Sequence, residues 1–280
     1  MIIKNYYERK KQLIPKYCGG KKAMDNLPLF KGTETDDFPP SINQETVEWA
    51  LQKTYEFAQL MSCYRCAMMQ IETKFNILNE EFSLQFDRQP ISTVKTRLKN
   101  PLSIRTKLGS KQLPLSIESI ERNLNDIAGI RVVCSFVEDV YMLADALLKQ
   151  DDITLIEEKD SIRHPKPNGY RSLHLIVAVP IFLEHEKRIM KAEIQLRTIA
   201  MDSWASLEHQ LRYKKENDFD ADMAAEILRC AELSAELDSR MNALKNTVYA
   251  DEHNESAIIQ KGLAEIKRRS GMKEDGTSVL

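Results

Sequence analysis

The chain has 280 residues, of which 42% are hydrophobic and 29% are charged, and its formal net charge is -2. This length and composition suit one large domain with a buried core and helical extensions. The charge excludes a chain that is polycationic throughout, so any site for a polyanion must be local.

Targeting and redox features favour a cytoplasmic protein without membrane contact. No apolar run has the length needed to cross a bilayer, and Lys4 lies too near the start for a signal peptide. Five cysteines, an odd number, indicate reduced thiols. Cys63 and Cys66 form a lone C-x-x-C motif in a helical pattern, and without a second pair we favour a structural role over zinc binding.

Residues 1–40 are predicted to be a basic, flexible arm. Up to Lys22, lysine and arginine are opposed by Glu8 alone, and Gly19, Gly20 and Pro39-Pro40 interrupt any periodicity. We favour an arm in water over a contact with RNA or tRNA.

A helical extension is predicted over residues 41–88. Ser41–Gln44 has the form of a capping box directly after the prolines. An apolar stripe with steps of three and four follows, made of Met61, Tyr64, Met68, Ile71, Phe75, Leu78 and Phe82. This spacing is typical of a helix packed on a core rather than of a cofactor-binding motif.

The central part of the chain, residues 89–218, mixes helices and strands without a regular βαβ repeat. Apolar and alternating patterns predict strands over Ile130–Cys134, Ile153–Glu158, Leu173–Val179 and Ile189–Leu196. Helical patterns begin near Pro101, run through Val140–Leu147 and cover Ile199–Tyr213. The fold class is therefore predicted as α+β, a mixed β-sheet flanked by helices.

A C-terminal helix is predicted over residues 219–250. Its apolar seam consists of Leu233, Leu237, Met241, Leu244 and Val248. A single helix cannot bury such a seam by itself, so it must pack on the domain or on another subunit. Residues 251–280 are predicted to be a partly disordered tail.

A basic run precedes the first apolar strand. Between Lys95 and Lys111 it has no acidic residue and contains Lys95, Arg97, Lys99, Arg105, Lys107 and Lys111. Ser103 and Lys107 are four residues apart on one helical face, and a helix that starts near Pro101 presents free N–H groups that attract phosphate. An ordinary solvated helix face explains the charge about as well. The lack of a carboxylate in the run favours a triphosphate site.

Two carboxylates are candidates for chemistry. As a strand, residues 193–197 place Glu193, Gln195 and Arg197 on one face, which suits the floor of a polar site. Asp126 stands before an apolar strand, where a turn cap is the default interpretation. With Glu193 as a second carboxylate, Asp126 becomes a candidate Mg²⁺ ligand, and Arg131 can face the same side.

The turn from Lys166 to Tyr170 is a shaped loop that ends in an aromatic ring. Tyr170 is either ordinary packing or a platform for a purine, and Asn168 offers an amide to a base edge. His174 is either a satisfied buried histidine or a phosphate contact. The common nucleotide-binding motifs are absent, so these residues together favour metal-assisted transfer of a phosphate-type group.

Five ordered segments resemble the synthetase domain of RelA/SpoT homologues, and especially the stand-alone small alarmone synthetases of the RelQ type. They are Arg97–Lys107, Asp126–Arg131, Asn168–His174, Glu193–Thr198 and Trp204–His209. The resemblance covers roughly residues 90 to 250 and implies a nucleotidyltransferase-like synthetase domain at 89–218. It implies transfer of the β,γ-pyrophosphate of ATP to the 3′-hydroxyl of GDP or GTP, giving (p)ppGpp in the stringent response. None of the five histidines is followed by Asp, as the hydrolase half of longer relatives would require, so synthesis without hydrolysis is expected.

The resemblance also assigns roles. Arg97 and Arg131 would sandwich the adenine of ATP, and its phosphates would be held by Lys99, Ser103 and Lys107. Asp126 would bind Mg²⁺, and Glu193 would take the proton of the 3′-hydroxyl or share the metal. Tyr170 would stack on guanine, and the rest of the acceptor site would consist of Lys166, Asn168, His174 and Gln195.

Assembly and two alternatives complete the expectations. The resemblance implies a homotetramer built through terminal helices, which would cover the C-terminal seam. One alternative is a toxic relative that pyrophosphorylates the 3′ end of tRNA, favoured by the basic arm and opposed by the intact loop at Tyr170. The other is a non-catalytic nucleotide-sensing or RNA-binding protein, opposed by the presence of both Asp126 and Glu193.

Overall fold

The computed structural model describes the backbone of residues 44–86, 88–214 and 220–269. Side chains are described between residues 53 and 249, apart from 86–87 and 213–219. The predicted basic arm and the capping serine Ser41 lie outside the described residues, so the predictions made for them are untested.

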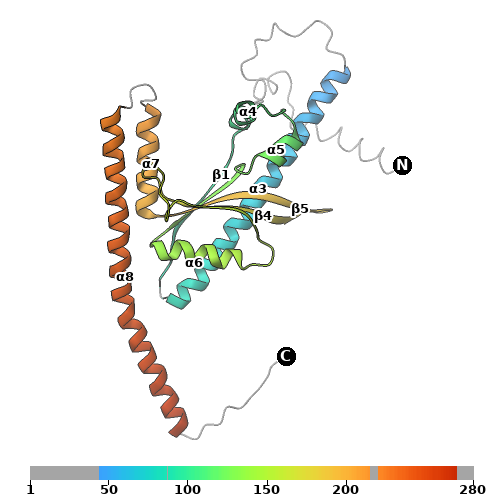
Figure 1. Ribbon diagram of the computed structural model, residues 1–280. Coiled ribbons are helices and arrows are strands. Elements are labelled where there is room, and N and C mark those ends of the chain that lie inside the picture. Colours follow the sequence, from blue (N-terminus) through green and yellow to red (C-terminus); the bar gives the residue numbers. More distant parts are fainter. Residues whose placement is uncertain (1–43, 87, 215–219, 270–280) are drawn as a thin grey trace.

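A five-stranded sheet forms the centre of the molecule (Figure 1). Its strands are β1 (Ile91–Leu98), β2 (Ala128–Cys134), β3 (Thr154–Asp160), β4 (Leu173–Phe182) and β5 (Lys187–Thr198). They lie in the order β1-β2-β5-β4-β3, with β2 and β5 parallel and the other neighbours antiparallel. The predicted mixed sheet is confirmed.

Six helices of the described chain surround this sheet: α3 (Gln44–Phe86), α4 (Pro101–Ser110), α5 (Ile117–Asn123), α6 (Val137–Leu148), α7 (Ile199–Lys214) and α8 (Ala221–Arg269). Five of them, α3, α4, α6, α7 and α8, match predicted helical segments. Strand β1 and helix α5 were not predicted. Strand β1 lies at the sheet edge and buries only Ile91 fully, so its sequence lacks the apolar alternation that marked the other strands.

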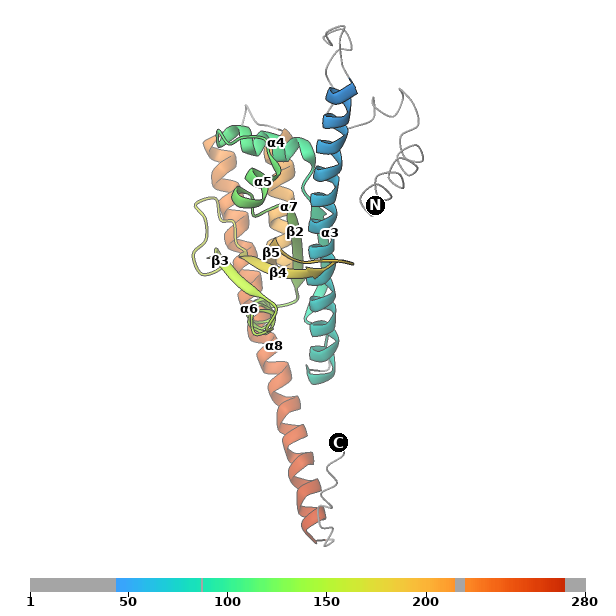
Figure 2. The ribbon, with the colours of Figure 1, turned by 90° about the vertical axis from the view of Figure 1, so that its right-hand side faces the viewer.

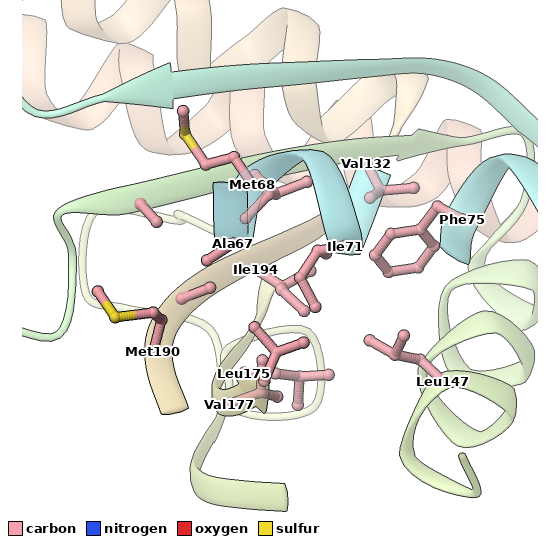
Figure 3. Packing of buried hydrophobic residues seen from close by; sticks show 14 of the residues in the cluster. Ala67, Met68, Ile71, Phe75, Val132, Leu147, Leu175, Val177, Met190 and Ile194 are labelled. Atoms are coloured by element: carbon pink, nitrogen blue, oxygen red, sulfur yellow. The ribbon is translucent and has the colours of Figure 1, made fainter. Parts of the chain in front are cut away.

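Helix α3 crosses one face of the sheet and supplies a large part of the core (Figures 1 and 3). Ala67, Met68, Ile71 and Phe75 of α3 pack with apolar side chains of the sheet and of α6, namely Val132, Leu147, Leu175, Val177, Met190 and Ile194. The predicted apolar stripe is thus core packing, as expected. The N-terminal helix is therefore part of the domain's hydrophobic core.

Helices α7 and α8 run side by side at one end of the sheet, and α8 then extends past the body of the molecule (Figures 1 and 2). Helix α8 is longer than predicted, because no proline occurs in it and Gly262 is its only glycine. Residues 251–269 of the predicted tail therefore lie in a helix. The remaining residues of that tail lie outside the described chain.

The two sides of α8 have opposite character. Towards its own chain, α8 packs Ile227 and Ala231 against Trp204 of α7, and further along Asn242, Lys245 and Asn246 hydrogen-bond to Glu138 of α6 at 2.7–3.1 Å. These bonds lower the pKa of Glu138 to about 2. The predicted seam faces outwards, with exposed fractions of 45–59% for Leu233, Leu237, Met241, Leu244 and Val248.

The positions of Cys63 and Cys66 agree with the predicted structural role. Cys63 is buried and Cys66 partly buried on α3, and both are free thiols. Burial raises the pKa of the Cys63 thiol, which disfavours a reactive thiolate there. Among the described helices, none combines the length and apolarity that a membrane span requires.

Candidate active site

The face of the sheet opposite α3 carries a continuous polar surface. Because side chains alternate along β5, Ile194 and Leu196 point into the core while Glu193, Gln195 and Arg197 point away from it. The strand register places Lys95, Arg131, Gln195 and His174 in one row across β1, β2, β5 and β4. We call this surface, with the loops and helix ends that border it, the polar face.

One part of the polar face, the lysine end, is formed by Arg97, Lys99, Ser103, Lys107, Asp126 and Arg131. Lys99 and Lys107 both donate to Oδ2 of Asp126, at 2.6 and 2.5 Å. Burial by itself raises the pKa of Asp126, but the two ammonium groups outweigh it and lower that pKa below its ordinary value. Asp126 is therefore a carboxylate held ionised between two cations.

The start of α4 borders the lysine end. Asn100 caps this helix by accepting from the backbone N–H of Ser103 at 3.0 Å, and Pro101 occupies the first turn, as predicted. The Ser103 hydroxyl forms no hydrogen bond with another described residue. Arg97 is exposed and forms no ion pair within the described chain. A hydroxyl and a guanidinium therefore remain for a ligand.

Gly129 separates Arg97 from Glu193 in the strand register. A Cβ atom at Gly129 would lie 3.3 Å from the backbone oxygen of Arg97, which is tighter than ordinary contact. A glycine here keeps β1 and β2 close and leaves no side chain between these two functional groups.

The other part of the polar face, the tyrosine end, is formed by Lys166, Asn168, Tyr170, His174, Glu193 and Gln195. Glu193 Oε1 lies 3.3 Å from His174 Nδ1, and Glu193 Oε2 accepts a hydrogen bond from Gln195 Nε2 at 3.3 Å. Burial by itself raises the pKa of Glu193, but the interactions with His174 and Gln195 produce a net lowering. The charge of Asp126 opposes this lowering, so the two carboxylates are near enough to interact.

The loop before β4 holds the aromatic ring of this end. Tyr170 accepts or donates a 2.8 Å hydrogen bond with His174 Nε2, and the Lys166 ammonium lies 4.7 Å from its ring centre. Asn168 stabilises the turn by accepting from the Tyr170 N–H and donating to Glu208 of α7. Gly169 has a φ of 85°, and a Cβ there would lie 2.3 Å from Ala231 of α8. The loop is therefore fixed against α7 and α8.

Every site residue predicted from the sequence thus borders the same polar face, in two groups. Two further residues border this face: Arg197, which strand alternation had placed here without a role, and Asp202, which no sequence pattern had indicated. Arg197 is 4% exposed and donates to Tyr170 Oη at 2.5 Å and to Gln195 Oε1 at 3.1 Å. Asp202, in the first turn of α7, accepts from Arg131 and Arg197. Arg197 follows Gln195 by two residues in a strand, which puts both on one face, whereas no sequence pattern indicates a role for Asp202.

The residues present fit a divalent metal ion at Asp126. The second oxygen of Asp126, Oδ1, is buried and has no hydrogen-bond partner among the described atoms. An orphaned carboxylate oxygen is costly to bury, and a cation would satisfy it. The described residues contain no group of three or more His, Cys, Asp or Glu side chains that would enclose a metal. Mg²⁺ does not require one, because it usually takes one or two carboxylates together with phosphate oxygens and water.

Sequence comparisons identify relatives over this part of the chain. A family model described as a region found in RelA/SpoT proteins matches residues 96–218. The chain is 41% identical over 185 residues to the GTP pyrophosphokinase YwaC of Bacillus subtilis (strain 168), which covers 66% of this chain and 88% of that protein. It is 33% identical over 186 residues to the GTP pyrophosphokinase YjbM of the same strain, with coverage of 66% and 86%.

Solved structures give the same answer for the fold. Small alarmone synthetase 2 from Bacillus subtilis matches with a TM-score of 0.63 and 38% identity, over 69% of this chain and 99% of that one. Small alarmone synthetase 1 from Bacillus subtilis, bound to its product pppGpp, matches with a TM-score of 0.63 and 32% identity, over 69% and 98%. The predicted fold class is confirmed by both.

Proposed function

Because this chain belongs to the RelA/SpoT family, we propose that it is a GTP pyrophosphokinase that transfers the β,γ-pyrophosphate of ATP to the 3′-hydroxyl of GDP or GTP. The observation that carries this proposal is that two carboxylates border one polar face, Asp126 beside two lysines and Glu193 beside a histidine that is bonded to the Tyr170 ring. Such a surface suits one nucleotide that brings phosphate charge and one that brings a base and a hydroxyl.

The lysine end would bind ATP. Lys99 and Lys107 supply charge to the phosphates, and Ser103 supplies its hydroxyl and lies in the first turn of α4, where the helix dipole favours anions. Arg97 and Arg131, in adjacent strands, present planar guanidinium groups for the adenine ring.

Mg²⁺ is part of this proposal, with Asp126 as its first protein ligand and Glu193 as a second candidate. When bound, it would neutralise charge that develops on the phosphate oxygens. Asp126 would meet the metal through its unpartnered Oδ1, because both lysines bind Oδ2. The two ammonium groups would then stand beside both the metal and the phosphates that they are proposed to hold.

The tyrosine end would bind GDP or GTP. The Tyr170 ring offers a stacking surface to guanine, the Lys166 ammonium lies over that ring, and Asn168 offers amide groups. His174 and Gln195 orient Glu193, whose carboxylate accepts the proton of the 3′-hydroxyl. The hydroxyl oxygen then bonds to the β-phosphorus of ATP, the bond from this phosphorus to the α,β-bridging oxygen breaks, and AMP leaves.

Assembly into a homotetramer through α8 is a further part of the proposal. The outward seam of α8 is apolar over five residues while the opposite side is engaged by Glu138. A lone surface helix turns its apolar stripe to the core, whereas this stripe faces water. A second copy would cover this seam. We place the assembled enzyme in the cytoplasm, where its nucleotide substrates are.

The direct test is transfer of label from γ-labelled ATP in the presence of Mg²⁺. Purified full-length protein is incubated in parallel with GDP, GTP or bulk tRNA as acceptor, and the products are separated. Label on GDP or GTP is the expected result. Label only on tRNA would replace the proposal with a tRNA pyrophosphokinase, and no transfer to any acceptor would refute an enzymatic role.

A further inference from the structure

A single carboxylate oxygen joins the two ends of the polar face. Asp202 lies on α7, and its Oδ1 accepts from Nη1 of Arg131 at 3.2 Å and from Nη1 of Arg197 at 3.3 Å. Arg131 belongs to the lysine end, and Arg197 contacts the tyrosine end. The Lys95 ammonium is also within 3.9 Å of the other Asp202 oxygen.

Asp202 is held firmly enough to act as an anchor. It is 9% exposed and lies in the first turn of α7, where the helix dipole stabilises a carboxylate. The same turn is tied to the sheet, because the Thr198 hydroxyl accepts from the backbone N–H of Met201 at 3.1 Å. Thr198 also donates to Asp238 of α8 at 2.8 Å. The position of Asp202 is thereby fixed by strand β5 and by α8.

Arg197 transmits this anchoring to both oxygens of Glu193. Arginine only donates, so Tyr170 Oη accepts from Arg197, and the same oxygen forms a 2.8 Å hydrogen bond with His174 Nε2. On the other side of the ring, His174 Nδ1 lies 3.3 Å from Glu193 Oε1. On a second route, Arg197 donates to Gln195 Oε1, and Gln195 Nε2 donates to Glu193 Oε2.

Pairing with Asp202 also explains why a buried arginine is tolerated here. Taking a guanidinium out of water is costly unless its charge is compensated. Asp202 supplies that charge, and it supplies it to Arg131 at the same time. Loss of the Asp202 charge therefore loosens a guanidinium at each end of the polar face.

We propose that Asp202 is a positioning residue that couples the ATP site to the acceptor site, acting on the first through Arg131 and on the second through Arg197. This inference rests on the proposed function, because it assigns the two ends to two nucleotides. It predicts that one substitution at Asp202 weakens both sites together.

The test is the Asp202→Asn variant, which keeps the size of the side chain and removes its charge. The expected result is a rise of about tenfold in the KM of ATP and in the KM of the acceptor, together with a lower kcat. Asp202→Glu, which retains the charge one methylene further out, should recover part of both KM values. A residue that merely supports the fold would instead lower the fraction of active enzyme and leave both KM values unchanged.

The matched control is Asp152→Asn, which removes a half-buried carboxylate bonded to Lys74 at 2.7 Å on the α3 side of the molecule. Neither KM should change in this variant. A change in only one KM in Asp202→Asn, or a lower kcat with both KM values intact, would overturn the proposal. Calorimetric binding of GDP and of a non-hydrolysable ATP analogue measures the same coupling without turnover. Calorimetry tests the coupling of the two sites, whereas failure of the wild-type protein to transfer label would refute the proposed function, so the two failures can be told apart.

Discussion

The two ends of the polar face differ in how completely they are built before any nucleotide binds. At the tyrosine end, hydrogen bonds run without interruption from Arg197 through Tyr170 and His174 to Glu193. At the lysine end, Lys99 and Lys107 share one carboxylate. The first arrangement holds its groups in place for a ligand, whereas in the second the phosphates of a ligand would compete with Asp126 for the same two ammonium groups.

Charge explains this difference. A triphosphate and its metal bring several charges, so the lysine end gains most from cations that are free to reorient, and Asp126 keeps them from repelling each other meanwhile. A 3′-hydroxyl brings no charge, and its reaction depends on a base held at one position. Preorganisation is therefore concentrated where the nucleophile is activated.

The largest expected effect comes from removing the base at the tyrosine end. Glu193→Gln keeps the shape and loses the charge, and kcat should fall by about 10²- to 10⁴-fold, the usual worth of general base catalysis. Binding of a non-hydrolysable ATP analogue, measured by calorimetry, should be retained because the lysine end is untouched. The control is Glu121→Gln, whose carboxylate pairs with Arg188 on the opposite face of the sheet. Near-normal turnover of Glu193→Gln would remove its role as base.

A smaller effect, on the metal requirement rather than on kcat, is expected at the lysine end. Asp126→Asn should raise the Mg²⁺ concentration needed for half-maximal activity by about 10- to 100-fold, as loss of groups that hold a metal does. Because Lys99 and Lys107 are then no longer neutralised, ATP without Mg²⁺ should bind at least as tightly as to the wild type. The measurements are a metal titration of activity and calorimetry in a chelator. An unchanged metal requirement would contradict the assignment of Asp126.

The third effect separates the acceptor from ATP. Tyr170→Ala should raise the KM of GDP by about tenfold, since base stacking on an aromatic ring is worth about 1–3 kcal/mol, and should leave the KM of ATP nearly unchanged. Tyr141→Ala is a matched control, because the Tyr141 ring also lies under a cation, with Arg163 4.6 Å from its centre. If the KM of GDP does not move, the ring does not stack on the base.

The contrast between the two ends also explains what the sequence could predict. Glu193, Gln195 and Arg197 share a face because of strand alternation alone, so their grouping followed from the sequence. The stripe of α3 and the strands β4 and β5 were predicted for the same reason: one face of each is buried, and the period records it.

Contacts between distant segments could not be read in that way. The lysine run contains no acid, which favoured free cations, yet Asp126, 27 residues after Lys99, pairs with both lysines. Asp202 lies 71 residues beyond Arg131 and carries no local pattern that distinguishes it from an ordinary first-turn acid. Such pairings are set by how β2, β5 and α7 pack, which periodicity does not specify.

The smallest expected effect is on stability, and it distinguishes the carboxylates by the sign of their pH dependence. The pKa values of Asp126 and Glu193 are lowered in the folded protein, so their contribution is present above the unfolded pKa and is lost as pH falls through the folded one. The pKa of Asp238, which accepts from Thr198, is raised by burial, so its contribution is lost as pH rises through its folded value.

Urea unfolding at fixed protein concentration, followed from pH 7 to below the ordinary carboxyl range of about 4, measures these signs. Asp126→Asn should be less stable than the wild type by about 1 kcal/mol at pH 7, with the difference shrinking as the pH falls. Asp238→Asn should show the opposite trend, with its smallest cost at pH 7. If Asp238 were an ionised, paired carboxylate like Asp126, the stability costs of the two variants would change with pH in the same direction. Opposite slopes would mean that the lysine end stores a paired charge, whereas the α8 contact at Thr198 holds a carboxyl group that burial disfavours as an ion.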